Sequence, residues 1–409
     1  MKMRKSNVSD QPFRKSVAFM LVFYWAILVA WQNISGTETR GAADIVVKAG
    51  LLLYFCWFYV KRARVVNGKI CWVLLIAIFL LITSISEISF SLKNLIFYVY
   101  PVLFMAMVYG LGDSYEITRV QLISFCNWVI AITMYAAVYA FIFQREMFIG
   151  VLSLTGAYSN ELTSFFLSNF EYGMYLASAI ISCLICLKYG DSISSKRFYY
   201  VAIAIFAVQL ALTFSRSTLY ALIICLIVIA LVGKGKTRYW IIGLSTLTVL
   251  AVLSIPELKQ FVYRVVMKGN NLSDRGELAL GAIDLYRSGS VAQKIFGFGI
   301  EETQRYFALM FRHPNVHNAY LQVLLYFGLA GFLPLMLFLV IQIIICIKIL
   351  RRNRYLGSIF LGQLLMVIAI MFTTTAIIFT SSIDTYFLTM FYIVVPKYVR
   401  NSLRKHTFD

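Results

Sequence analysis

Long apolar runs, broken by short clusters of charged residues, are the feature that most constrains this chain. Many of them approach the ~20 residues that an α-helix needs to cross a bilayer core. Over the 409 residues 61% are hydrophobic and only 13% are charged, which is unlike soluble globular proteins. Because the runs are continuous rather than alternating, they favour membrane helices over membrane β-strands. The sequence therefore predicts an all-α polytopic membrane protein.

The apolar pattern predicts about twelve transmembrane helices. They are expected at 17–33, 45–60, 70–85, 92–111, 120–143, 170–187, 198–214, 218–232, 239–255, 319–347, 356–380 and 382–398.

Lys and Arg residues gather in alternate connections, and this bias predicts the orientation of the chain. Cytoplasmic loops are enriched in these residues, so both termini are expected in the cytoplasm. One connection, 256–318, is much longer than the others and is expected on the extracytoplasmic face. This gives membrane helices over 1–255, an extracytoplasmic catalytic loop over 256–318, and further helices with a cytoplasmic tail over 319–409.

The net charge of +19 does not indicate nucleic-acid binding, because the basic residues lie in short clusters beside the spans. Anionic lipid headgroups are the partners that such clusters fit. All 7 cysteines lie within or beside predicted spans, so neither a disulfide framework nor a thiolate metal site is expected. No cofactor is implied.

The long loop contains "NLSDRGELALGAIDLYRSG", which reads as a helix ended by Gly289. Asp274 and Glu277 have the spacing of a capping box. That start places Arg275 in the first turn, where a cation opposes the helix dipole. The alternatives for Arg275 are a solvated surface arginine and a functional one.

A second arginine interrupts an apolar region in "LALTFSRSTLYALI". Arg216 lies there at the edge of the hydrocarbon, where a charge is costly and often functional; snorkelling to a lipid phosphate is the alternative. The predicted topology places Arg216, Arg275 and His317 on the same face. Guanidinium groups suit a diphosphate, and a neutral imidazole suits proton abstraction.

Two of the 3 histidines lie in "RHPNVHNAYLQVLLYFGLAG", just before a span. The spacing of His313 and His317 matches some zinc sites. However, Pro314 opposes a continuous helix, and no third ligand is nearby, so no metal is expected. The alternatives for His317 are a general base with an ordinary pKa and a structural histidine. Loss of His313 is expected to be mild.

"TFSRST", "SDRGELALGAIDLYRSGSVAQKIFGFG" and "HNAYLQVLLYFGLAG" occur in this order, after "SNFEYGMYLA". Together they resemble the O-antigen polymerase and O-antigen ligase superfamily of bacterial surface polysaccharide assembly. The resemblance covers about residues 160 to 335 and implies a metal-independent inverting membrane glycosyltransferase of the all-helical, GT-C-like type. Its donor would be an undecaprenyl-diphosphate-linked oligosaccharide.

By motif position, the resemblance implies that Arg216 and Arg275 contact the diphosphate and that His317 is the catalytic base. Asn318 and Asn169 are expected to help bind substrate. Gly276 and Glu277 depart from the apolar residues that many relatives carry after this arginine.

Three functions follow as alternatives. A polymerase would extend a lipid-linked repeat unit, a ligase would transfer polymer to lipid A core, and a flippase would move lipid-linked sugar without forming a bond. The polymerase is favoured, because "HNAYLQ" and "GLAG" look more like that branch. The expected location is the bacterial inner membrane, with a flippase and a chain-length regulator as possible partners.

Overall fold

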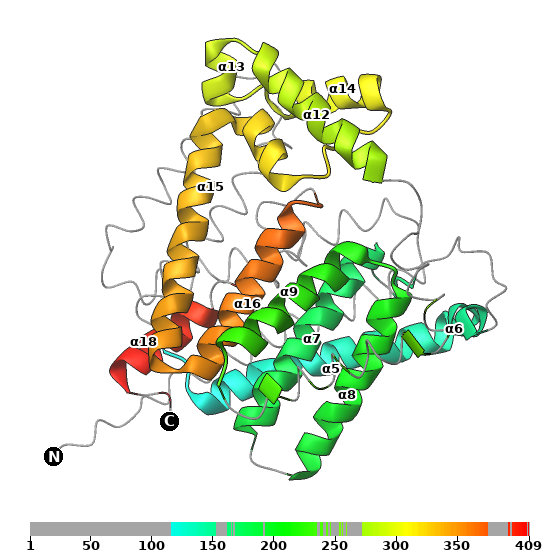
Figure 1. The fold of residues 1–409 in the computed structure, drawn as a ribbon, viewed down its shortest axis with the longest axis vertical. Coiled ribbons are helices and arrows are strands. Elements are labelled where there is room, and N and C mark those ends of the chain that lie inside the picture. Colours follow the sequence, from blue (N-terminus) through cyan, green and yellow to red (C-terminus); the bar gives the residue numbers. More distant parts are fainter. Residues whose placement is uncertain are drawn as a thin grey trace, which may run out of the picture. The chain divides into compact units, whose positions relative to one another are not determined.

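The computed structural model describes residues 116–152, 162–190, 193–234, 272–374 and 395–406, apart from residues 165 and 167, with a few isolated positions elsewhere. Within these ranges all regular secondary structure is helical (Figure 1). Four helices are long and apolar enough to cross a membrane: α5 (Arg119–Phe143), α7 (Asn169–Tyr189), α15 (Ala319–Arg352) and α16 (Arg354–Met371). A shorter apolar helix, α9, covers Arg216–Val232. The all-α membrane class is therefore confirmed.

Six predicted spans correspond to helices, these five and α8 (Ile193–Leu212). The predicted spans at 17–33, 45–60, 70–85, 92–111, most of 239–255 and most of 382–398 lie outside the described residues. The count of about twelve spans, the division at residues 255 and 318, and the orientation stay predictions.

The chain divides into two compact units, and Ile123–Leu212 belongs to the first of them. This unit holds most of α5, the short helix α6 (Arg145–Leu152), α7 and α8. Helices α7 and α8 pack against each other. Buried polar side chains here are bonded within the protein: Gln209 donates to the Ala137 carbonyl at 3.0 Å and accepts from the Tyr172 hydroxyl. An apolar solvent requires such internal partners.

The second unit includes Thr213–Asp409, and its membrane part is built on three neighbouring helices, α9, α16 and α15. The backbones of α9 and α16 come close at Gly362, where an added Cβ would lie 2.8 Å from the Cys225 carbonyl oxygen. Small residues allow such close approach between membrane helices. Arg354 Nε donates to the Val232 carbonyl oxygen at 2.7 Å, so the end of α9 meets the start of α16. The two helices are therefore antiparallel.

Helix α15 also runs antiparallel to α16, because one residue, Asn353, separates them. At the far end the Tyr320 hydroxyl donates to the Ile368 carbonyl at 3.1 Å. The first turn of α15 thus lies beside the last turn of α16. Since α9 also begins at that end, Arg216 and the start of α15 lie at one end of this three-helix group.

Three loop helices pack against α15 (Figure 1). They are α12 (Leu272–Ser288), α13 (Val291–Phe296) and α14 (Ile300–Phe311). Short helices are therefore present, as predicted, in the part of 256–318 that the structure describes. The placement of this loop on the extracytoplasmic face stays a prediction.

Helix α15 has a break at Gly328, whose φ of 61° and ψ of −161° are not helical. The loop after α13 packs into this break, where the Phe298 amide donates to the Leu325 carbonyl at 2.7 Å. Gly297, with φ of 93°, approaches the Tyr326 carbonyl so closely that a Cβ would lie 2.2 Å from its oxygen. The turn at Gly297 is therefore the point where the loop joins α15.

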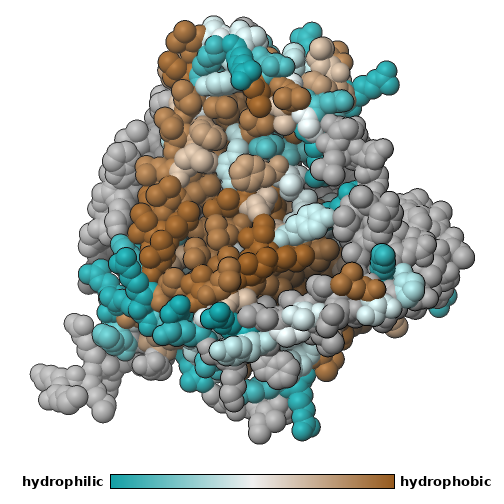
Figure 2. Space-filling view, viewed as in Figure 1, coloured by the Kyte–Doolittle hydropathy of each residue, from teal (hydrophilic) through white to brown (hydrophobic). Residues whose placement is uncertain are grey.

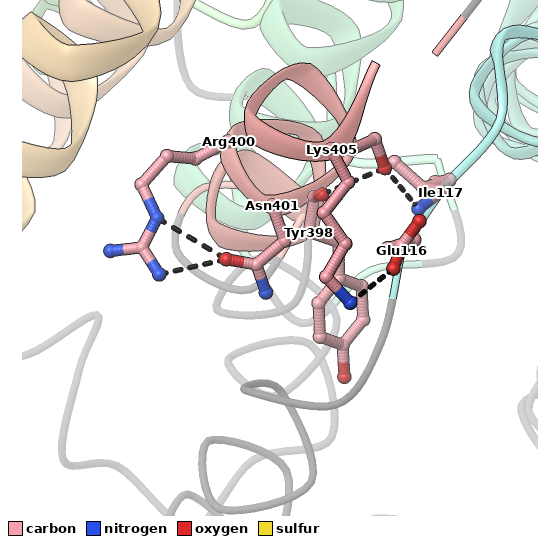
Figure 3. A network of polar contacts seen from close by, with 7 residues as sticks. Glu116, Ile117, Tyr398, Arg400, Asn401 and Lys405 are labelled. Carbon is pink, nitrogen blue, oxygen red and sulfur yellow. Dashed lines mark hydrogen bonds and ion pairs between the residues drawn. The ribbon is translucent and has the colours of Figure 1, made fainter. Parts of the chain in front are cut away.

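The opposite end of the three-helix group carries α18 (Val395–Lys405) (Figure 1). Arg352 of α15 donates to the Leu403 carbonyl at 2.7 Å, and Lys405 pairs with Glu116 (Figure 3). The Ile117 amide donates to the Ser402 hydroxyl at 2.7 Å. Several basic residues lie at this end, and the positive-inside rule predicts that it is the cytoplasmic one.

Between the two ends, α15 exposes a continuous apolar surface, the brown area along this helix in Figure 2. Its exposed side chains include Leu329, Leu333, Leu337, Val340, Ile341, Ile344 and Ile347. A lipid-facing side of a transmembrane helix has this composition.

Candidate functional site

His317 lies directly before α15, in a segment that leads from α14 into the membrane. Its φ of 54° is in the left-handed region, which a residue with a side chain adopts at some cost. Asn318 follows as the N-cap, and its Oδ1 accepts from the amides of Tyr320 and Leu321, both at 3.1 Å. The cap fixes the backbone beside His317, so the imidazole is held at a helix start as predicted.

The left-handed turn at His317 brings its ring against that of His313. The two Nε2 atoms are 3.0 Å apart, and the ring centroids are 4.3 Å apart. On its other side, His313 Nδ1 is 3.2 Å from the Asn315 amide nitrogen and 3.1 Å from the Asn315 carbonyl oxygen. His313 therefore has a backbone partner for either tautomer.

The pKa of His317 is lowered from 6.5 to about 4. Burial is the main cause, followed by the charges of His313 and Arg275. The expectation of an ordinary pKa is therefore wrong, because this imidazole is half-buried among positive groups. Its neutral form predominates at pH 7, and a base must be in that form.

Arg275 lies in α12, which begins at Leu272 rather than at the predicted capping box. Asp274 is thus inside the helix and is not its N-cap. Arg275 is an exposed residue overall. Partial desolvation and then the positive charge of Arg216 lower the pKa of Arg275.

Arg216 is the first residue of α9, at the edge of the apolar segment as expected. The turn before it is tight, with Phe214 at φ of 50° and the Arg216 amide donating to the Phe214 carbonyl at 3.0 Å. Ser215 and Thr218 hydroxyls bond to each other at 3.0 Å within this start of the helix. The side chain of Arg216 is half-buried.

The three basic residues predicted to act together are thus electrostatic neighbours in one unit. Arg216 acts on Arg275, and Arg275 acts on His317. They come from three separate segments, α9, α12 and the start of α15. Positive groups that repel one another stabilise a bound anion together, so the cluster suits a diphosphate.

The two predicted asparagines differ in what the structure says of them. Asn318 uses its Oδ1 to cap α15. Asn169 is the first residue of α7, after the N-cap Ser168, and belongs to the first unit. Substrate binding by either residue stays a prediction.

Two polar features near the site were not predicted from the sequence. The pairing of His313 with His317 depends on a left-handed backbone that no residue pattern signals. Gln322, one turn into α15, donates to the Tyr326 hydroxyl at 2.9 Å while its buried Oε1 lacks a hydrogen-bond partner. Its only sequence signal is a polar side chain inside an apolar run.

Within the part of the chain that the structure describes, no group of three or more His, Cys, Asp or Glu residues could hold a metal ion. The Nε2 atoms of His313 and His317 lie at hydrogen-bond distance from each other. The arrangement offers an anion site beside a neutral base.

Comparison with known proteins gives one family. Residues 201–336 match the O-antigen ligase family. The match supports the O-antigen polymerase and ligase superfamily, and confirms the resemblance, over about a third of the chain. It includes Arg216, Arg275, His317 and Asn318, but it begins at residue 201 and so excludes Asn169. No curated protein matches the chain.

Proposed function

We propose that the protein is a membrane glycosyltransferase of the O-antigen polymerase type. It would transfer glycan from an undecaprenyl-diphosphate-linked donor to a lipid-linked repeat unit on the extracytoplasmic face. The observation that carries the proposal is the proximity of three basic residues: in addition to burial, the charge of Arg216 lowers the pKa of Arg275, and the charge of Arg275 lowers the pKa of His317. The family match over residues 201–336 supports a function within the O-antigen polymerase and ligase superfamily.

In this proposal the two arginines stabilise the diphosphate leaving group. When the bond between the sugar and the diphosphate breaks, negative charge develops on the diphosphate. Guanidinium groups stabilise that charge with paired hydrogen bonds, so neither a general acid nor a metal ion is required.

His317 serves the acceptor. Its neutral imidazole takes the proton of the attacking hydroxyl, and the oxygen forms the new glycosidic bond with inversion at the sugar carbon. A bound diphosphate brings negative charge next to Arg275 and His317, and an opposite charge raises the pKa of a histidine. Donor binding would therefore strengthen the base when it is needed.

An O-antigen ligase is the second candidate, and the description of the matching family favours it. The donor chemistry would be the same, and the acceptor would be lipid A core. A flippase for lipid-linked sugar is the third candidate, but transporters usually bind near the bilayer midplane. Here the three basic residues lie at one end of the three-helix group.

Product analysis with the purified protein tests the proposal. A defined lipid-linked oligosaccharide is supplied alone, or together with lipid A core, in liposomes. Longer lipid-linked chains without core support the polymerase. Transfer only onto core would replace it with the ligase, and movement between leaflets without a new glycosidic bond would contradict both enzymes.

A further inference from the structure

The proposed reaction gives no role to His313. This histidine follows α14 and reaches His317 across a proline and a left-handed backbone turn. The Nε2 to Nε2 distance of 3.0 Å is a hydrogen-bond distance. One proton must lie between these two atoms, since two hydrogens there would clash and two lone pairs would repel.

The Asn315 peptide group makes both placements of that proton possible. Its amide can donate to His313 Nδ1, and then the Nε2 of His313 carries hydrogen and donates to His317. Its carbonyl can instead accept from His313 Nδ1, and then the Nε2 of His313 accepts from His317. His313 therefore keeps its backbone partner when its tautomer changes.

The second arrangement is the one that prepares His317 as a base. With its Nε2 hydrogen donated to His313, neutral His317 has a lone pair on Nδ1. We propose that His313 is a positioning residue that holds His317 in this tautomer and receives its Nε2 proton during glycosyl transfer. This inference rests on the proposed function, because it needs His317 to act as the base.

The step balances in protons and electrons. The acceptor hydroxyl gives its proton to His317 Nδ1, and its oxygen forms the bond to the sugar carbon while the bond to the diphosphate breaks with its electron pair. The Nε2 proton of His317 moves to His313 Nε2. His313 is then an imidazolium whose Nδ1–H donates to the Asn315 carbonyl, and His317 is neutral again.

The surrounding charges favour this transfer. Arg275 from α12 and, in its protonated form, His313 from the segment after α14 are the described groups whose positive charge acts on His317. Moving the positive charge from His317 to His313 takes it off the ring on which Arg275 acts. The Asn315 carbonyl oxygen then stabilises the new imidazolium through a charge-assisted hydrogen bond.

Substitution of His313 by Gln and by Ala separates a proton-accepting role from a merely orienting one. Gln can accept the His317 hydrogen bond, but it cannot accept a proton. We expect both variants to lose kcat by roughly 10–100-fold, less than the 10²–10⁴-fold expected for removal of the base itself, with little change in KM. The contact between His313 and His317 thus replaces the sequence-based expectation that loss of His313 is mild. His406→Gln is the control, because this exposed third histidine lies in the segment after α18.

The pH profile adds a readout that a folding defect would not move. The charge of His313 helps to lower the pKa of His317. Without His313, the acidic limb of kcat/KM should therefore move to higher pH, and this can be measured on residual activity.

The outcomes separate this inference from the proposed function when His317→Ala is assayed alongside. Near-normal kcat in His313→Gln would show that His313 only orients His317, and would overturn proton transfer. If both His313 variants keep the wild-type kcat and the wild-type acidic limb of kcat/KM while His317→Ala is inactive, only the role of His313 is overturned. Activity in His317→Ala would instead overturn the base on which the inference rests.

Discussion

Gly328 of α15 packs its bare Cα against the carbonyl group of Ile295, at the end of α13. A Cβ added at Gly328 would lie 2.3 Å from the Ile295 carbonyl oxygen, and the φ of 61° is unfavourable for any other residue. This contact joins the loop helices to the helix that follows His317. The position of Arg275 relative to Arg216 and His317 therefore depends on the lack of a side chain at Gly328 and at Gly297.

Gly328→Ala should displace the loop from α15 and lower the rate of glycosyl transfer at least tenfold. A displacement of reacting groups by ~1 Å can lower a rate 10²-fold. Thermal unfolding in detergent should occur at lower temperature than in wild type. Gly276→Ala is the matched control, since an added Cβ there meets nothing within 4 Å. Equal activity of the two variants would show that the contact does not position the site.

Arg216→Lys keeps the charge at the start of α9 but loses the planar fork that binds a diphosphate bidentately. We expect turnover to stay at least tenfold below wild type, with Arg216→Ala lower still. Initial rates on lipid-linked donor measure this, with Arg197→Lys at an exposed position of α8 as control. Recovery of most activity in Arg216→Lys would mean that charge alone suffices.

The acidic limb of kcat/KM reports the base in the free enzyme. Because the folded pKa of His317 is lowered to about 4, the neutral base persists as pH falls through 6 and is lost only as pH approaches 4. The acidic limb of kcat reports the base in the donor complex. It should lie at higher pH than the limb of kcat/KM, because a bound diphosphate raises the pKa of His317. Rates between pH 4 and 8 measure both. They are measured in His313→Gln as well, because protonation of His313 would block the proposed proton transfer, and a kcat/KM limb near 6.5 that is also present in this variant would contradict the structure.

Arg275→Gln removes one of the charges that lower the pKa of His317. The acidic limb of kcat/KM should therefore move to higher pH, and KM for the donor should rise. Arg287→Gln, in the last turn of the same helix, should change neither. An unmoved limb together with an unchanged KM would remove Arg275 from the site.

Much of this arrangement follows from the sequence, because membrane spans need only local hydrophobicity. The starts of α9 and α15 were predicted closely, since Arg216 and Asn318 mark abrupt changes from polar to apolar residues. The start of α12 was misplaced, because Asp274 and Glu277 form a motif that also occurs inside helices. The spacing of these two residues alone cannot distinguish a helix start from a helix interior.

Tertiary features account for what the sequence did not show. The break at Gly328 lies in an apolar run, and the close backbone of Ile295 together with the positive φ explains why glycine is needed there. The lowered pKa of His317 likewise depends on burial and on Arg275, which is distant in the chain. Neither property is encoded in the residues next to the affected position.

The central claim is that His317 is the base for glycosidic bond formation, and the direct measurement is product formation by purified His317→Ala. The variant should insert and unfold like wild type, yet form glycosidic bonds ~10²–10⁴-fold more slowly from a defined lipid-linked donor. Near-normal product formation at equal protein concentration would contradict the account and leave His317 as a residue that only shapes the start of α15.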